Sequence, residues 1–194
     1  KQGRVRVPQY LKGHTALFIK LLDNLPEAAQ VKPELKQLTN LSLAGNQVSD
    51  VSALTGLKQL TMLDLSDNEI TDLTPLAELK ELKTLGLKFN RITDLTPLAE
   101  LTKLESLVLG EFRTKRRSLE NSWSGTMRAP ETNHITNLKP LTGLKNLRHL
   151  TVYLLNDFGA SKSEVDMLAA ALPQCSIVEV PTSHQLSDFL HSGD

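Results

Sequence analysis

Cysteine and aromatic residues are scarce in this chain. Its 194 residues include one cysteine, one tryptophan, two tyrosines and five phenylalanines. Because Cys175 stands alone, the chain has neither an internal disulfide nor a cysteine-rich metal site. The redox compartment stays open, since a cytosolic protein and a bacterial secreted protein that avoids cysteine share this composition.

Net charge and long apolar runs are absent too. The 22 lysines and arginines balance the 22 aspartates and glutamates, so no overall charge draws the chain to nucleic acid or to a membrane. No run of about 18 apolar residues occurs, and we expect no membrane span. The P-loop, G-x-S-x-G and H-E-x-x-H motifs are missing as well. We therefore expect a protein that is not an enzyme and that holds no cofactor.

The sequence does contain a phrase of 22 residues that recurs through its middle. Two series of leucines and one of asparagines keep this interval: Leu41, Leu63, Leu85 and Leu107; Leu43, Leu65, Leu87 and Leu109; Asn46, Asn68 and Asn90. The spacing L-x-x-L-x-L-x-x-N, with a period of about 20 to 29 residues, is typical of leucine-rich repeats. It predicts an α/β solenoid, a stack in which each coil contacts only its neighbours.

Each repeat predicts a short strand, a turn and a short helical segment. In Leu63-Asp64-Leu65, alternation directs both leucines to the core and Asp64 to the outer face of the strand. Stacked asparagines in such repeats bond backbone groups of neighbouring coils that would otherwise be buried without partners. An acidic or amide side chain is expected to cap each helical segment. These capping residues are Asp50, Asp72, Asp94 and Asn137.

The repeat register divides the chain into segments. We predict an N-terminal extension over 1–15, a leucine-rich repeat domain over 16–180 and a tail over 181–194. The domain is predicted to contain a degenerate first repeat (16–34), regular repeats (35–109), an insertion (110–132), a resumed repeat (133–155) and a C-terminal cap (156–180). Within the cap, Ser161 and Glu164 form a capping box that opens a helix, Pro173 ends it, and a strand follows over 176–180. An added edge strand is expected over 4–7.

The spacing breaks after Leu109. The next asparagine of the series is due at position 112 and comes at Asn133, 21 positions late. The extra residues are either an inserted loop or a degenerate repeat, and Arg128, Ala129 and Pro130 at the expected strand positions favour the loop. Insertions in repeat proteins gather on one edge and often belong to the binding face.

The phrase L-x-x-L-x-x-L-x-L-x-x-N-x-I-x-D-L-x-P-L resembles the repeats of bacterial internalins, over 35–109 and again over 133–155. The ending Leu172-Pro-Gln-Cys175-Ser-Ile177 resembles the closing segment of many bacterial leucine-rich repeat proteins. The resemblance implies a right-handed horseshoe with a parallel sheet on its concave side and short 3₁₀ turns outside. It also implies a bacterial protein, secreted or on the cell surface rather than cytoplasmic, that binds other proteins, which for internalins are host surface proteins.

The candidate binding surface has two parts. Residues that flank the strand leucines face the concave side, where Gly86, Gly110 and Ala44 are expected to leave room for a partner. From this face we select Met62, Asp64, Thr84, Lys88, His149 and Tyr153. Beside the break lie aromatic and basic residues, the types that dominate interface hot spots: Phe89, Phe112, Arg113, Arg116, Arg117 and Trp123. Alternatively, the aromatic residues among them only anchor the insertion to the solenoid.

We therefore expect a non-catalytic protein-interaction module that is monomeric and binds a partner protein. An inhibitor or immunity-type protein stays open as an alternative. So does an intracellular scaffold, because cytosolic phosphatase regulators share this repeat subclass. A nucleic-acid binder would use the basic run 113–117, but no basic stripe or aromatic platform accompanies that run, and we expect no nucleic acid. His184, Asp188 and His191 have a metal-ligand spacing, although a polar helix face is the simpler interpretation.

Overall fold

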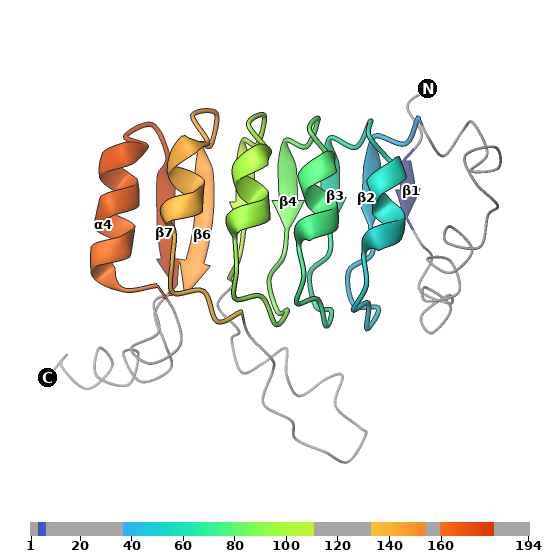
Figure 1. Ribbon diagram of the computed structural model, residues 1–194, viewed down its shortest axis with the longest axis horizontal. Coiled ribbons are helices and arrows are strands. Elements are labelled where there is room, and N and C mark those ends of the chain that lie inside the picture. Colours follow the sequence, from blue (N-terminus) through green and yellow to red (C-terminus); the bar gives the residue numbers. More distant parts are fainter. Residues whose placement is uncertain (1–3, 7–36, 111–132, 154–159, 181–194) are drawn as a thin grey trace, which may run out of the picture.

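The computed structural model describes residues 4–6, 37–110, 133–153 and 160–180. Within them, seven strands form one open parallel sheet, and the order of the strands in the sheet is their order in the sequence (Figure 1). The strands are β1 (Arg4–Arg6), β2 (Asn40–Ser42), β3 (Met62–Asp64), β4 (Thr84–Gly86), β5 (Ser106–Val108), β6 (His149–Tyr153) and β7 (Ser176–Val180). This sheet confirms the predicted solenoid.

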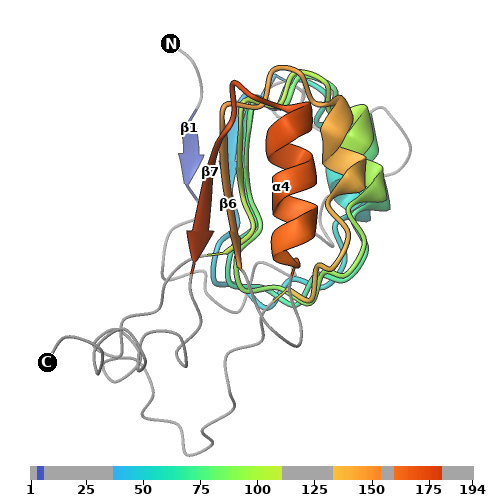
Figure 2. The same cartoon turned by 90° about the vertical axis from the view of Figure 1, so that its left-hand side faces the viewer.

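A layer of short helices lies opposite the sheet. It consists of the 3₁₀ helices η2 (Ser52–Gly56), η3 (Thr74–Glu78), η4 (Thr96–Glu100) and η5 (Lys139–Gly143), and of the α-helix α4 (Lys162–Ala171). Figure 2 looks along the stack from the α4 end and shows the strands on one side of the coils and the short helices on the other. Among the described helices, none is both long and apolar enough to cross a membrane.

Aspartates start the first three of these 3₁₀ helices. The Oδ1 atoms of Asp50, Asp72 and Asp94, hereafter the capping aspartates, each accept a hydrogen bond of 2.8 Å from the backbone N–H two residues on. These bonds lower the pKa of all three carboxyls; threonine hydroxyls contribute first at Asp72 and Asp94, and the Ser52 backbone N–H contributes first at Asp50. Asn137 makes the same backbone bond, 2.9 Å long, at η5. The predicted bonds to the first N–H of each helix are thus present, but their acceptors lie one residue before the N-cap, a position held by an apolar residue without a side-chain cap.

The core is a ladder of leucines that runs the length of the stack. Leu63 of β3 lies opposite Leu85 of β4, which lies opposite Leu107 of β5, and all three are fully buried. Burying one such side chain contributes about 1.5–3 kcal/mol. Each leucine is covered partly by the next coil, so this contribution depends on the neighbouring repeats.

The asparagines form a second ladder, which satisfies buried backbone groups. Asn90 donates from Nδ2 to the carbonyl oxygens of Leu65 and Leu87, 3.0 Å away in each case, and accepts from the Ile70 N–H at 3.0 Å. Asn133 repeats the pattern: its Nδ2 donates to Leu87 O at 2.8 Å and to Leu109 O at 2.9 Å. Asn133 therefore fills the ladder position due at 112.

Strands β5 and β6 are direct neighbours despite the break in the repeat. Leu107 lies opposite Leu150, and the Leu109 N–H donates to Thr151 O at 2.9 Å. The intervening residues 111–132 lie outside the described part of the chain.

The N-terminal end of the sheet differs from the expected arrangement. Strand β1 pairs directly with β2, and Val5 lies opposite Leu41. This is the place that counting the repeat backward would give to a strand from 16–34, residues which themselves lie outside the described ranges. The expected edge strand at 4–7 is present as Arg4–Arg6.

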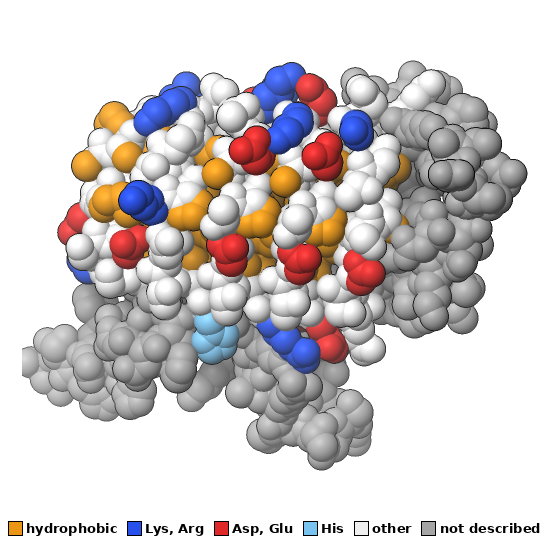
Figure 3. All heavy atoms as spheres, viewed as in Figure 1, with side chains coloured by type: hydrophobic (Ala, Val, Ile, Leu, Met, Phe, Trp, Pro, Cys, Tyr) orange, Lys and Arg blue, Asp and Glu red, His pale blue; other side chains and the backbone are white. Residues whose placement is uncertain are grey.

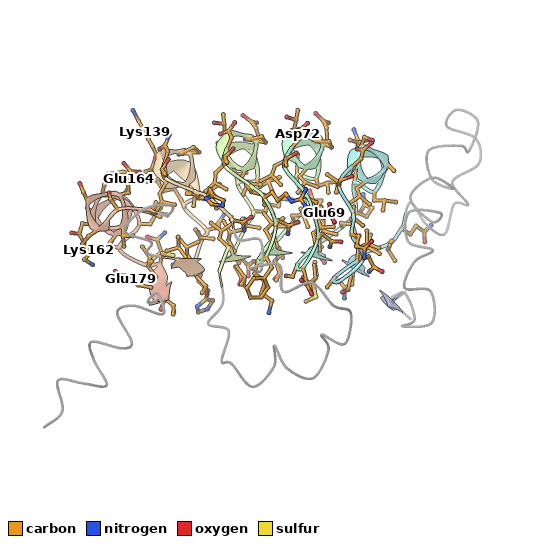
Figure 4. All side chains as sticks on the ribbon, turned by 90° about the horizontal axis from the view of Figure 1, so that it is seen from below. Glu69, Asp72, Lys139, Lys162, Glu164 and Glu179 are labelled. Atoms are coloured by element: carbon orange, nitrogen blue, oxygen red, sulfur yellow. The ribbon has the colours of Figure 1, made fainter. Side chains whose placement is uncertain are left out.

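Helix α4 and strand β7 form the C-terminal coil. The Glu164 N–H donates to Ser161 Oγ at 3.2 Å, which confirms Ser161 as the N-cap and one half of the predicted capping box, and Val165 and Leu168 are buried. Glu164 Oε2 accepts a 2.8 Å bond from the Leu138 N–H and so ties α4 to the coil of η5. Figure 4 shows Lys162 of α4 near Glu179 of β7, and their charged atoms are 2.8 Å apart.

Candidate protein-binding surface

From β2 to β7 the outward side chains form two rows across the strands, which we name after one member each. In the register of β1, Arg4 lies beside Asn40 and Arg6 beside Ser42. The Met62 row is Asn40, Met62, Thr84, Ser106, His149 and Ser176. The Asp64 row is Ser42, Asp64, Gly86, Val108, Thr151 and Val178. Adjacent strands are about 4.8 Å apart, so each row is about 24 Å long. In Figure 4 side chains stand on both sides of the strands.

The rows present a mixed surface with small side chains. Met62 is 40% exposed and Val178 is 54% exposed, and these are the large apolar side chains that are exposed in the described part of the chain. His149 is exposed, whereas Asp64 and Thr84 are half-buried. No group of histidine, cysteine, aspartate and glutamate among the described residues could hold a metal ion.

Asp64 and Gly86 are adjacent in their row and share space. A Cβ atom at Gly86 would lie 2.7 Å from Asp64 Oδ1 and 3.1 Å from Ser66 Oγ. Asp64 Oδ1 also accepts a hydrogen bond of 3.0 Å from the Ser66 N–H. The Asp64 carboxylate therefore extends over the neighbouring strand, at the place where Gly86 has no side chain.

This arrangement corrects one expectation. The sequence predicts that the room at Gly86 admits a partner, but the Asp64 carboxylate occupies it. The signal was available in the sequence, because Asp64 and Gly86 stand 22 residues apart and must therefore be cross-strand neighbours. The two residues are recognised as neighbours only when the 22-residue register between coils is applied to the sequence.

Phe89 is buried and has an unusual backbone conformation. It is 8% exposed and has φ +56°, and the equivalent residues of the two preceding coils, Gly45 and Asp67, have φ +73° and +60°. A left-handed conformation costs a bulky residue about 1–2 kcal/mol. The Lys88 ammonium lies 6.0 Å from the centroid of the Phe89 ring, at the outer limit of a cation–π contact.

The structure brings together one half of the predicted site. Met62, Asp64, Thr84 and His149 are outward residues of the two rows, and Lys88 follows β4. Tyr153 ends β6, and its side chain is outside the described part. The other half also lies outside the described residues: Phe112, Arg113, Arg116, Arg117 and Trp123.

Charges away from the rows are paired between coils. Five ion pairs join residues of adjacent repeats, with N–O distances from 2.7 to 3.6 Å: Lys58–Glu78, Lys80–Glu100, Lys103–Glu81, Lys83–Glu105 and Arg91–Glu69. Figure 3 shows the helix side of the molecule, where basic and acidic side chains gather along one edge and further acidic side chains form a row across the coils. Exposed pairs contribute at most about 1 kcal/mol each.

The half-buried Cys175 packs against the core, and burial raises the pKa of its thiol. A raised pKa lowers the fraction of reactive thiolate. The geometry thus gives Cys175 a packing role.

Known proteins with similar sequence or structure define the class. A family described as "Leucine Rich repeats (2 copies)" matches residues 36–78. The crystal structure of internalin C2 from Listeria monocytogenes aligns with a TM-score of 0.54 and 29% identity, over 77% of this chain and 54% of that chain. An internalin F structure from the same species has 27% identity and a TM-score of 0.49, over 83% of this chain and 48% of that chain.

A more distant structure shares the fold alone. The crystal structure of a TLR13–ssRNA13 complex aligns with a TM-score of 0.54 and 22% identity, over 76% of this chain and 19% of that chain. A comparison with curated proteins finds no match. The chain is a leucine-rich repeat protein. Its fold is internalin-like, and it spans about half the length of the two internalin structures, 54% and 48%.

Proposed function

We propose that this chain is a non-catalytic module that binds a partner protein through the concave sheet. The observation that carries the proposal is the contrast between its two faces. On the helix side, acidic side chains accept bonds at the helix starts or pair with lysines of a neighbouring coil. On the sheet side, two regular rows offer exposed Met62 and Val178 among small polar residues. Such a surface, held on a stacked scaffold, suits an extended protein ligand.

The segment 110–132 is the second part of the proposed site. The direct pairing of β5 with β6 and the bonds of Asn133 to Leu87 and Leu109 support a segment that leaves the coil after Leu109 and rejoins it at Asn133. Both ends of the segment are thus beside the end of β5, next to the rows. Partner contacts by Phe112, the arginines from 113 to 117 and Trp123 remain part of this proposal.

A bacterial origin also belongs to the proposal. It is supported by the internalin C2 structure from Listeria monocytogenes, with 29% identity to this chain. The internalin resemblance further favours a secreted or cell-surface protein. Monomeric behaviour and the absence of nucleic-acid binding are expectations that accompany this function.

A peptide selection tests the use of the sheet. A library of random peptides displayed on phage is selected against the immobilised full chain, and the selected peptides are measured by fluorescence anisotropy. Thr84→Arg places a long side chain in the middle of the Met62 row, and Ala170→Arg places the same side chain on the exposed part of α4. We expect Thr84→Arg to weaken binding about tenfold or more, which is about 1.4 kcal/mol, and Ala170→Arg to leave it unchanged.

Two outcomes would contradict the proposal. Peptides that bind the Thr84→Arg variant as tightly as the wild type use another surface. If a folded variant that lacks residues 113–130 retains full affinity, the segment 110–132 is not part of the site, and the concave sheet alone binds the peptides. Circular dichroism of each variant verifies that the solenoid is intact.

A further inference from the structure

We infer that Asp64 determines which partners bind the concave face, because its carboxylate binds a basic side chain, arginine or lysine, of the partner. This inference rests on the proposed function, because it names what the partner must present to the Asp64 row. Three observations support it: Asp64 has no ion pair among the described residues, Ser66 and Gly86 fix the position of its carboxylate, and Met62 is exposed beside it.

Asp64 has no counter-charge among the side chains that the structure describes. Glutamates along the edges of the stack have cations within ion-pair distance, and the capping aspartates accept bonds at the helix starts. Asp64 accepts a hydrogen bond from the Ser66 N–H and forms no ion pair with any residue that the structure describes. A carboxylate has about four acceptor sites on its two oxygens, so most of its capacity is open to a ligand.

The Asp64 carboxylate is also held in place before any ligand arrives. The Ser66 N–H fixes Oδ1 at 3.0 Å, and the missing side chain of Gly86 gives that oxygen its position over β4. A group that is already oriented loses less conformational entropy when it binds, which raises affinity. Gly86 needs no left-handed backbone angle. Glycine is therefore required at position 86 because a Cβ there would take the space of the Asp64 carboxylate, and not because of the backbone conformation.

Met62 supplies the apolar half of such a contact. It stands two residues before Asp64 on the same strand, so both side chains point outward from β3, and it is 40% exposed. Arginine and lysine have apolar stems that pack on apolar surface while the charged end reaches an acid. A thioether adapts its shape to such a stem. Met62 and Asp64 together match the stem and the head of one basic side chain.

The chemistry of the row disfavours the other ligand classes. A phosphate backbone would be repelled by the carboxylate of Asp64. A metal ion requires further acidic or histidine ligands, and the described residues contain no such group. A cationic protein side chain remains as the ligand that gains from both features.

The test uses the same peptide selection, analysed for composition and measured on four variants. Asp64→Asn keeps the shape and an acceptor for the Ser66 N–H but removes the charge. Gly86→Ala keeps the charge but brings a Cβ to 2.7 Å from Oδ1, so the carboxylate must move. The matched controls are Asp72→Asn, which removes a charge on the helix side, and Gly143→Ala, where a new Cβ meets no atom within 4 Å.

We expect the selected peptides to share an arginine or lysine. Asp64→Asn and Gly86→Ala should each weaken their binding about tenfold or more, as should replacement of that basic residue by alanine. The two control variants should bind as the wild type does, and binding should weaken as salt is added.

The results separate this inference from the proposed function. Peptides that lose binding to Thr84→Arg but tolerate Asp64→Asn, or that lack a basic residue, overturn the role of Asp64 and leave the concave surface in place. Peptides that tolerate Thr84→Arg as well overturn both. A selection that yields no binding peptide counts against both.

Discussion

Replacement of Asn90 by alanine tests how the asparagine ladder stabilises the stack. Asn90 is fully buried, and its amide joins two coils through hydrogen bonds to Leu65 O and Leu87 O and from the Ile70 N–H, each 3.0 Å long. Alanine makes none of these bonds. The variant leaves the buried Ile70 N–H without its partner, whereas the Leu65 and Leu87 carbonyls each keep a 2.8 Å bond, from Asn68 and Asn133 respectively.

The expected cost follows from the unpartnered Ile70 N–H and from the two lost bonds to carbonyl oxygens. A buried polar group that loses its partner costs about 1–3 kcal/mol, and relaxation or an entering water molecule recovers part of that cost. With about 0.5–1.5 kcal/mol for each of the two lost carbonyl bonds, we expect the free energy of unfolding to fall by about 2–4 kcal/mol. That is a large share of the roughly 5–15 kcal/mol by which typical domains are stable.

Urea unfolding followed by circular dichroism measures the change. Asn146→Ala is the matched control, because Asn146 also bonds a neighbouring coil, at Thr102 O with a 2.8 Å distance, but in an exposed position. We expect the control to cost about 1 kcal/mol or less. The reasoning would be refuted by an Asn90→Ala cost below about 1 kcal/mol, or by equal costs for the two variants.

Three further predictions concern caps and backbone conformation. The pKa values of the capping aspartates are lowered from the ordinary value of 3.8, so their contribution to stability is complete above that pH and is lost as pH falls through the folded-state values. Changing all three to asparagine, the residue that caps η5, should therefore flatten the acid limb of a plot of urea midpoint against pH, and an unchanged limb would contradict this. Gln47 is exposed with φ +56°, and Gln47→Gly should raise the free energy of unfolding by about 0.5–1 kcal/mol; a loss would show that no strain exists there. Glu164→Ala should cost about 1–2 kcal/mol through the lost bond from the Leu138 N–H, and Glu164→Gln should restore most of it, whereas equal costs would mean that the charge, not the bond, matters.

The regular coils were predictable because each one is stabilised by the same residues, 22 positions away. Strand leucines, ladder asparagines and capping aspartates all lie where the period places them, and the C-terminal helix and strand follow from ordinary capping and stop residues. Each further copy of the repeat supports the same predicted coil, because the side chains of one copy must pack against those of the next.

Features that occur once were harder to predict. Strand β1 lies beside β2 through a pairing of Arg4 with Asn40, and no period connects these residues. An edge strand needs only one neighbour, so it leaves little pattern in the sequence. The sequence predicts Phe89 as a contact residue because it is aromatic, yet Phe89 is buried in a left-handed turn position that usually takes small or polar residues.

The ladder has a consequence for how such a chain can change in length. A deletion of residues 67–88 would join Ser66 to Phe89 and bring Asn90 to the place of Asn68, with every leucine still opposite a leucine. Unequal recombination between repeats of the gene would then remove or add one strand at a time, in steps of about 4.8 Å across the sheet. A protein built in this way can fit its surface to a longer or shorter ligand without redesigning any single contact.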